Sequence, residues 1–305
     1  MNPLQLVSDR QGVWSATANR LKARYERARW MTFALSIGGA VLGTIASQLD
    51  GDPRTQVAIL GAVLFAIAGF LTARALGSHN ATRWLRARAA SEALKREGYK
   101  YAAGAAPYDD PATRNSKLNH EREEIEKTVD EMLGDASPEG RGSAPKGPMS
   151  PEEYIQARVQ KQIDEYFEPK ANSAQRTASA LRWVEAGLAL AAACLTAIVG
   201  VIEKDPLGWG FDFVALTAVI TAVSAMVVAH MEAGRYDFTV ASYRSTARRL
   251  RNALAGAPES FVPGSSEWSA FVNECEGILW EANNTWIAKW TSASERAAAP
   301  AAASK

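Results

Sequence analysis

Residues 30–73 of this chain read WMTFALSIGGAVLGTIASQLDGDPRTQVAILGAVLFAIAGFLTA. Within this stretch, Met31 to Leu49 and Thr55 to Ala73 carry no charged residue, and the polar turn Asp50 to Arg54 separates them. Each run has about the length of a helix that crosses the hydrocarbon core of a bilayer, roughly 20 residues. Helices that are apolar on every side need lipid or a very large core to cover them. The stretch therefore predicts a helical hairpin that spans a membrane.

The same plan recurs in the second half of the chain. Residues 182–183 repeat the Arg-Trp pair of residues 29–30, and residues 186–202 and 213–229 are again uncharged. An Arg-rich helix is expected after each hairpin. An internal repeat of this kind determines the architecture, so it is assigned before other features. The chain is therefore predicted to be a tandem duplication of a two-span module.

The domain boundaries follow from this repeat. A length of 305 residues fits two domains. The predicted parts are a first module (1–133, with spans at about 30–49 and 55–74), a flexible Gly/Pro/Ser-rich linker (134–150), a second module (151–294, with spans at about 183–202 and 211–230) and a disordered tail (295–305). The sequence contains no strand pattern of any length. The predicted fold class is an all-α membrane protein with long helical stems in the cytoplasm.

The stems carry their own signals. Residues 150–153, Ser-Pro-Glu-Glu, have the pattern of a capping box that starts a helix, and Pro169 is expected to kink or split that helix. Residues 118–132 carry a narrow apolar stripe that is expected to pack on the stems and close the first module. The wider aromatic stripe of residues 268–286 is expected to cover the face formed by residues 243–254, or alternatively to bind a partner.

Positive charge is concentrated on one side of both hairpins. Basic residues precede the first and third spans and follow the second and fourth, whereas the loops at 50–54 and 203–212 are slightly acidic. The positive-inside rule places both termini and the linker of this multi-pass protein in the cytoplasm. Trp30 and Trp183 are expected at the inner interface and Trp209 at the outer one. A net charge of +1 favours no nucleic-acid partner.

The sequence contains no arrangement typical of catalysis or metal binding. His79, His120 and His230 are far apart, and none of them has a metal-ligand spacing. Cys194 and Cys275 have no expected disulfide partner. We therefore expect no cofactor, no metal and no enzymatic activity.

The candidate functional residues lie in the spans instead. A stripe of small residues along the first span consists of Ser36, Gly39, Ala40, Gly43 and Ser47. Such stripes let helices approach closely in lipid, either within one chain or between the chains of a homo-oligomer. Thr217 and Thr221 could line a pore, or could hydrogen-bond to their own helix. Glu185 and His230 are expected at similar depth and could form an interfacial pair, or could reach water separately.

Two sets of arginines mark the stems that come after the spans. They are Arg83, Arg86 and Arg88 in the first module, and Arg244, Arg248, Arg249 and Arg251 in the second. These residues could bind an anionic ligand such as a nucleotide, contact anionic lipid head groups, or fix the topology.

Three separate groups of residues give the second module a specific pattern. They are Tyr154, Arg158 and Tyr166 before the third span, residues 243–247 after the fourth, and residues 274–286 in the closing helix. This pattern resembles the SLATT domains, two-span effector modules of prokaryotic conflict systems, and the first module resembles them less clearly.

The resemblance implies a membrane effector of antiviral defence. Such an effector would be activated by a separate cytoplasmic sensor, and would oligomerise in the lipid bilayer and permeabilise it. Two alternatives remain open. One is a non-conducting scaffold that tethers a cytoplasmic partner through its stems, and the other is a housekeeping channel or transporter.

Overall fold

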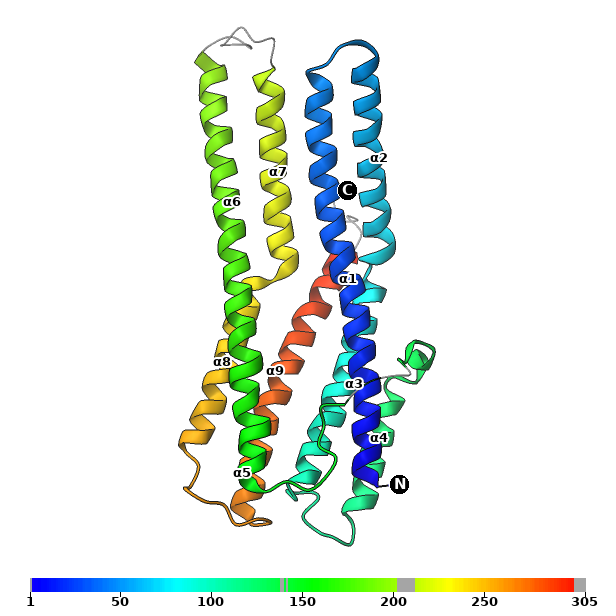
Figure 1. Cartoon of the computed structure of the whole chain (residues 1–305), viewed down its shortest axis with the longest axis vertical. Helices are drawn as coiled ribbons and strands as arrows, with labels where there is room; N and C mark the ends of the chain where they lie inside the picture. Colours follow the sequence, from blue (N-terminus) through cyan, green and yellow to red (C-terminus); the bar gives the residue numbers. More distant parts are fainter. Residues whose placement is uncertain (1, 138–139, 141, 202–211, 299–305) are drawn as a thin grey trace, which may run out of the picture. The chain divides into compact units, whose positions relative to one another are not determined.

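The computed structural model describes residues 2–137, 140, 142–201 and 212–298, and these residues form helices and connecting segments without a strand (Figure 1). The long helices are α1 (Pro3–Ser47), α2 (Gly51–Ala75), α3 (Ser78–Ala102), α4 (Arg114–Lys127), α6 (Glu168–Val201), α7 (Phe213–Gly234), α8 (Tyr236–Ala255) and α9 (Ser266–Ala298). The short ones are the 3₁₀ helix η1 (Asp130–Asp135), α5 (Pro151–Tyr154) and the π-helical segments η2 (Ile155–Gln160) and η3 (Gln162–Phe167). The predicted all-α fold is confirmed.

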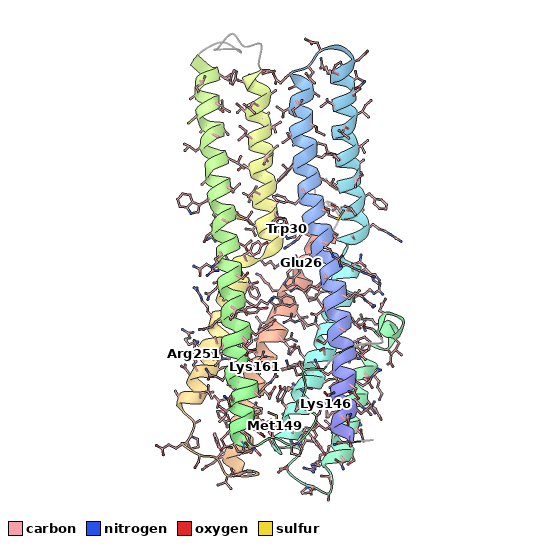
Figure 2. The ribbon with its side chains drawn as sticks, in the orientation of Figure 1. Glu26, Trp30, Lys146, Met149, Lys161 and Arg251 are labelled. Atoms are coloured by element: carbon pink, nitrogen blue, oxygen red, sulfur yellow. The ribbon has the colours of Figure 1, made fainter. Side chains whose placement is uncertain are left out.

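Within the described residues, four helical segments are long and apolar enough to cross a membrane. They lie in α1, in α2, in the continuous segment Pro151–Gly200, and in the segment Phe213–Ala255. In the described part of the chain, all the large apolar side chains that are exposed lie in these segments, except Leu133 and Val262. One of the exposed side chains is Trp30 of α1, which is labelled in Figure 2. Trp183, for example, is 79 % exposed. Apolar surface of this extent is typical of lipid contact, so the chain is a multi-pass membrane protein.

Two compact units make up the chain, and their boundaries do not follow the sequence repeat. The span unit contains Tyr25–Leu76 and Ser173–Phe238. The stem unit contains Met1–Arg24, Gly77–Asn172 and Thr239–Lys305. Each unit therefore takes segments from both halves of the chain.

Close backbone contact holds the first hairpin of the span unit together. A Cβ atom on Gly39 of α1 would lie 2.9 Å from the ring of Phe65 of α2. A Cβ atom on Gly61 of α2 would lie 3.2 Å from the carbonyl oxygen of Gly39. Only glycine leaves room for this approach, and close approach maximises van der Waals contact between helices in lipid.

The two hairpins meet through Gln48 at the end of α1. The backbone N–H of Asp212, just before α7, donates to Oε1 of Gln48 at 2.6 Å, and Nε2 of Gln48 donates to the Asp212 carbonyl at 3.3 Å. Asp212 also caps α7, because its Oδ1 accepts from the backbone N–H of Val214 at 2.9 Å. The end of α1 and the start of α7 therefore lie at the same end of the span unit. The predicted outer Trp209 lies outside the described residues.

The core of the stem unit forms where α1, α3 and α4 meet. Trp14 of α1, Leu94 of α3 and Leu118 of α4 are all buried in one apolar cluster. Val129 and Met132, which come after α4, belong to the same cluster. The predicted packing of residues 118–132 on the stems is confirmed.

Helix α9 packs on a different partner from the one expected. It lies chiefly against α3, the stem of the first module, rather than against α8. The rings of Trp84 and Trp286 have centroids 4.9 Å apart, and the indole N–H of Trp268 donates to the Ala103 carbonyl at 2.8 Å. The apolar stripe of α9 is wide enough to pack against either α3 or α8. These two helices occupy equivalent positions in the two sequence repeats. The sequence pattern therefore could not distinguish them.

The segment at 142–150 is docked on the helices, so the expectation of a flexible linker is wrong for these residues. The backbone N–H of Ser143 donates to Oε1 of Gln11 of α1 at 2.8 Å. The backbone N–H of Met149 donates to the Ala102 carbonyl of α3 at 2.8 Å. The acceptors come from helices far away in the sequence, so the local composition gives no sign of them.

The next helix begins as predicted. The hydroxyl of Ser150 accepts from the backbone N–H of Glu153 at 3.2 Å, and the Glu153 carboxylate accepts from the backbone N–H of Ser150 at 2.9 Å, which completes the capping box. Pro169 does not split the helix, because it is the second residue of α6 and the chain stays helical on both sides. The chain changes from π-helical to α-helical geometry immediately before Pro169.

Gln11 offers a direct test of the linker contact. It is buried on α1, donates to Ser91 at 3.0 Å and accepts from the backbone N–H of Ser143. Gln11→Leu would leave buried polar groups unsatisfied, at roughly 1–3 kcal/mol each. We expect a lower midpoint in thermal unfolding of the detergent-solubilised protein. Gln5→Leu, at an exposed position of the same helix, is the control, and equal midpoints for the two variants would contradict the docked linker.

Candidate functional site

A buried ion pair between Arg158 of η2 and Glu276 of α9 lies inside the stem unit. Nε and Nη2 of Arg158 donate to the two carboxylate oxygens at 2.8 Å each, and the two side chains are 3 % and 1 % exposed. The hydroxyl of Tyr154 donates to the same carboxylate at 3.0 Å. The guanidinium carbon also lies 4.5 Å from the centre of the Tyr99 ring. A bidentate pair of this geometry fixes the register of one helix on another.

The surroundings of this pair determine which of its groups are charged. Burial disfavours the guanidinium charge, but the charge and hydrogen bonds of Glu276, together with Tyr99 and Glu92, raise the pKa of Arg158 above its ordinary value. Burial and the same carboxylate raise the pKa of Tyr154 well above its ordinary value, so its hydroxyl remains a donor. Burial and Glu276 also raise the pKa of Cys275 to about 12. This thiol is therefore protonated at neutral pH and is no nucleophile.

A second polar cluster surrounds Arg88 of α3. Its Nη2 donates to the Tyr166 hydroxyl at 2.9 Å, and its Nε donates to Oδ1 of Asn283 at 3.2 Å. The guanidinium carbon lies 4.6 Å from the centre of the Trp286 ring. The hydroxyl oxygens of Tyr166 and Tyr243 are 3.4 Å apart. Arg88 thus joins α3 to η3, α8 and α9.

A small cavity of about 70 Å³ lies between the two clusters. The polar residues that line it include Arg88, Glu92, Lys95, Arg158, Tyr166 and Asn283. Burial and the nearby Arg158 charge lower the pKa of Lys95. Burial opposes the charge of Glu92, but Lys95, Arg88 and Arg158 together lower the pKa of this carboxyl. The cavity is therefore charged, with positive groups in excess.

Both clusters are built largely from the residues that distinguish the second module in the sequence. Residues 154–286 match the family model described as "SMODS and SLOG-associating 2TM effector domain 1". This region of the chain is a SLATT domain. Residues 13–116 match a second model, described as "Protein of unknown function (DUF4231)". No curated protein and no solved structure matches the chain.

The match confirms the predicted family, and the family implies a membrane effector of conflict systems. The two matched regions fall in different halves of the chain, which is consistent with a tandem duplication.

The structure brings the predicted family residues together and adds others to them. Tyr154 and Arg158 of the SLATT domain meet at Glu276, and Tyr166 meets Tyr243. Sequence reasoning missed Glu92, which lies outside the SLATT domain on α3. Its spacing of three residues from Lys95 was the available signal, but such pairs are common on exposed helix faces.

The structure divides the small-residue stripe of α1 in two. Gly39 and Ala40 are buried, whereas Gly43 and Ser47 are exposed and Ser36 is half-buried. A Cβ atom on Gly43 would have no neighbour within 4 Å. The buried part is used within the hairpin, and the exposed part is open to lipid or to another chain.

The other predicted residues of the spans have local partners. The hydroxyls of Thr217 and Thr221 donate to carbonyls of their own helix at 2.9 Å each, which is the alternative to pore lining. The ring of His230 lies with its centroid 4.3 Å from each of the rings of Trp30 and Phe33. The possible pair with Glu185 is not formed among the described residues, and the rings of Trp30 and Phe33 of α1 contact the imidazole instead.

Most of the stem arginines outside the cavity are engaged by acids within the chain. The ion pairs are Arg83–Asp135, Arg86–Glu131 (3.0 Å), Arg249–Glu281 (2.7 Å) and Arg251–Glu168. Arg244 and Arg248 are exposed. These acids lie far away in the sequence, so the arginine pattern alone predicted a more basic stem surface than the structure has.

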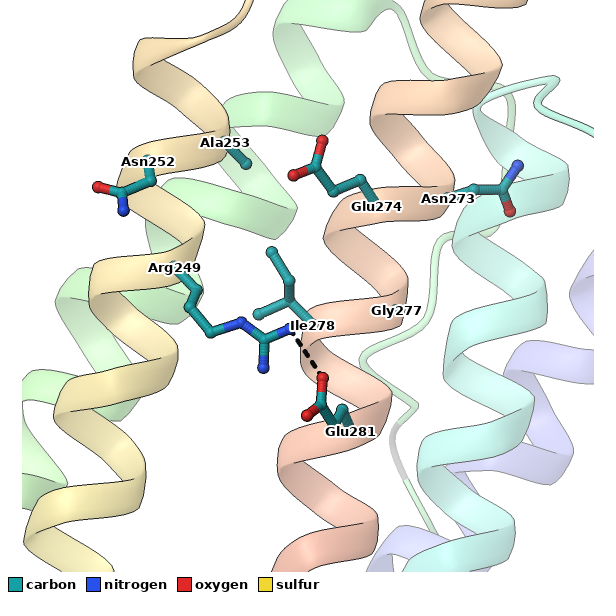
Figure 3. A pocket seen from close by; sticks show the side chains of 8 residues that line it. All are labelled: Arg249, Asn252, Ala253, Asn273, Glu274, Gly277, Ile278 and Glu281. Carbon is teal, nitrogen blue, oxygen red and sulfur yellow. Dashed lines mark hydrogen bonds and ion pairs between the residues drawn. The ribbon is translucent and has the colours of Figure 1, made fainter.

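Arg249 and Glu281 face each other across an open groove between α8 and α9 of the SLATT domain (Figure 3). The groove has a volume of about 510 Å³, and its lining includes Ala253, Gly277 and Ile278. Small side chains on both walls keep it open.

The buried ion pair gives a test of what holds the SLATT domain together. Glu276→Gln would leave the Arg158 charge buried and unpaired, and we expect a loss of roughly 3–5 kcal/mol in the free energy of unfolding. Urea unfolding followed by tryptophan fluorescence would measure this loss. Glu281→Gln, which removes an exposed pair on the same helix, should leave the midpoint near that of the wild type. Similar midpoints for the two variants would contradict a central role for Glu276.

Proposed function

We propose that this chain is an effector that oligomerises in the bacterial inner membrane and permeabilises it when a separate cytoplasmic sensor activates it. The SLATT match supplies the class of protein. The observation that supports oligomerisation is the exposure of the third span, since the most apolar window of Pro151–Gly200 buries none of its residues within the chain. A span that buries none of these residues offers its surface to lipid or to other copies.

The first span supplies the closest contact for a second copy. Lipid gives no hydrophobic force between helices, so small residues that allow close packing determine where helices associate. Gly39 already packs on Phe65, whereas the Cβ direction of Gly43 is open. We therefore assign the contact between chains to the face of Gly43 and Ser47.

The alternative function is a non-conducting scaffold. The open groove between α8 and α9 favours it, because Ile278 and the exposed carboxylate of Glu274 would suit a helix of a cytoplasmic partner. The two functions differ in whether the membrane leaks, so dye release from vesicles distinguishes them.

The proposed orientation predicts the location of reporters fused to the chain. Reporters fused near Gly51 and near Lys204, which lies outside the described residues, should be located outside the cytoplasm. A reporter fused near Gly140 should be located in the cytoplasm. The physical reason is that the basic flanks of all four spans resist translocation. Alkaline phosphatase and green fluorescent protein fusions would measure this, and a cytoplasmic signal from either loop would overturn the orientation.

The contact at Gly43 predicts the effect of a larger side chain. Gly43→Leu should leave insertion intact, because leucine makes the span more apolar. It should separate neighbouring chains and abolish crosslinked oligomers, growth arrest on overexpression and dye release from loaded vesicles. Gly39→Leu should instead lower the amount of folded protein, because its side chain would meet Phe65 within the hairpin.

Ala34→Leu is the matched control for added bulk. Ala34 is exposed and lies nine residues before Gly43, which at about 3.6 residues per turn puts it on the opposite face of α1. This variant should behave like the wild type. Wild-type vesicles that stay sealed while oligomers form would contradict permeabilisation and favour the scaffold. Undiminished leakage from the Gly43 variant would contradict the proposed contact.

A further inference from the structure

The cavity between α3, η2, η3, α8 and α9 has the properties of a binding site. Its volume of about 70 Å³ is enough for about two water molecules, at roughly 30 Å³ each, or for one compact anion. Arg88, Glu92 and Lys95, which line it, are only partly buried, so the cavity remains accessible from solvent. It belongs to the stem unit, and binding of a ligand there does not depend on permeabilisation of the membrane.

The charges of the cavity do not balance. Arg88, Lys95 and Arg158 line it as cations, and Glu92 is the carboxylate among the lining residues. The second carboxylate in reach, Glu276, is already bound to Arg158 by two hydrogen bonds. Three cations therefore face two carboxylates, and one positive charge is left over.

Hydrogen-bond donors in the cavity also lack acceptors. Asn283 is 8 % exposed, and its Oδ1 accepts from Nε of Arg88, but its Nδ2 has no hydrogen-bond partner among the described residues. The ammonium of Lys95 makes no hydrogen bond or ion pair within the part of the chain that the structure describes. Buried donors without acceptors carry a free-energy penalty, and they are usually satisfied by ordered water or by a bound ion.

We propose that this cavity binds one small oxyanion of the phosphate class, held by the Lys95 ammonium and by Nδ2 of Asn283, with Arg88 adding positive charge. Such an anion supplies both the missing negative charge and the missing acceptors. Glu92 on the same wall opposes further negative charge, so a single anionic group is expected. Because Lys95 belongs to α3 and Asn283 to α9, the anion would join the two modules and stabilise the contact between their stems.

Thermal unfolding of the purified full-length protein in detergent tests this proposal. Inorganic phosphate should raise the unfolding midpoint saturably, and chloride at the same ionic strength should not. Lys95→Met removes the charge and Asn283→Asp replaces the free donor while keeping an acceptor for Arg88. Each variant should weaken the apparent phosphate affinity at least tenfold. Lys161→Met, at an exposed lysine outside the cavity, should leave the affinity unchanged.

The outcomes separate the possible sources of the anion. A shift with both inorganic phosphate and methyl phosphate would support a site that also takes the phosphoryl end of a larger molecule. A shift with inorganic phosphate alone would support a site for the free ion. No shift beyond that of chloride, or an equal shift in wild type, Lys95→Met and Asn283→Asp, would overturn the proposal. Lys95→Met removes no hydrogen bond of the described structure, so the test remains valid if Asn283→Asp fails to fold.

Discussion

The ion pair between Arg158 and Glu276 is the interaction on which the arrangement of the stems depends. Both groups are buried, so neither tolerates the loss of the other, and their bidentate geometry allows one register of α9 on η2. With α9 in that register, the indole of Trp268 donates to the Ala103 carbonyl, and the ring of Trp286 packs against the ring of Trp84 of α3. Arg158 lies in the π-helical segment η2, and π-helical turns are frequent at functional sites.

This constraint explains why two sequence repeats do not fold as two separate bodies. The closing helix of the SLATT domain covers the stem of the first module, and residues 142–150 are hydrogen-bonded to α1 and α3. Amphipathic stems bury their apolar faces against one another, whereas the uncharged spans need lipid. Segments of the same chemical kind therefore gather in one unit, whichever repeat they come from. A ligand in the cavity beside Arg88 would act on this shared contact.

The span unit follows a different rule. Its helices have little of their surface buried within the chain, and the tight contacts occur where glycine removes the side chain, as at Gly39 and Gly61. Without a hydrophobic force between helices in lipid, each contact depends on local shape. The small-residue stripe of α1 therefore has two parts. Gly39 packs against α2 within the hairpin, and Gly43 is available for contact with another chain. Exposed spans are compatible with an effector whose active form is an assembly.

The sequence alone determined the features that depend on neighbouring residues. Uncharged runs of span length, the capping box at Ser150 and Glu153, and the Tyr154, Arg158 and Tyr243 pattern of the SLATT domain were all readable from it. Only the tertiary structure decided that α9 packs against α3 and that Gln11 is hydrogen-bonded to the segment at 142–150. It also decided that most stem arginines form ion pairs with acids far away in the sequence. The physical reason is that periodicity shows which face of a helix is apolar, whereas the choice between two similar partners depends on contacts between residues far apart in the chain.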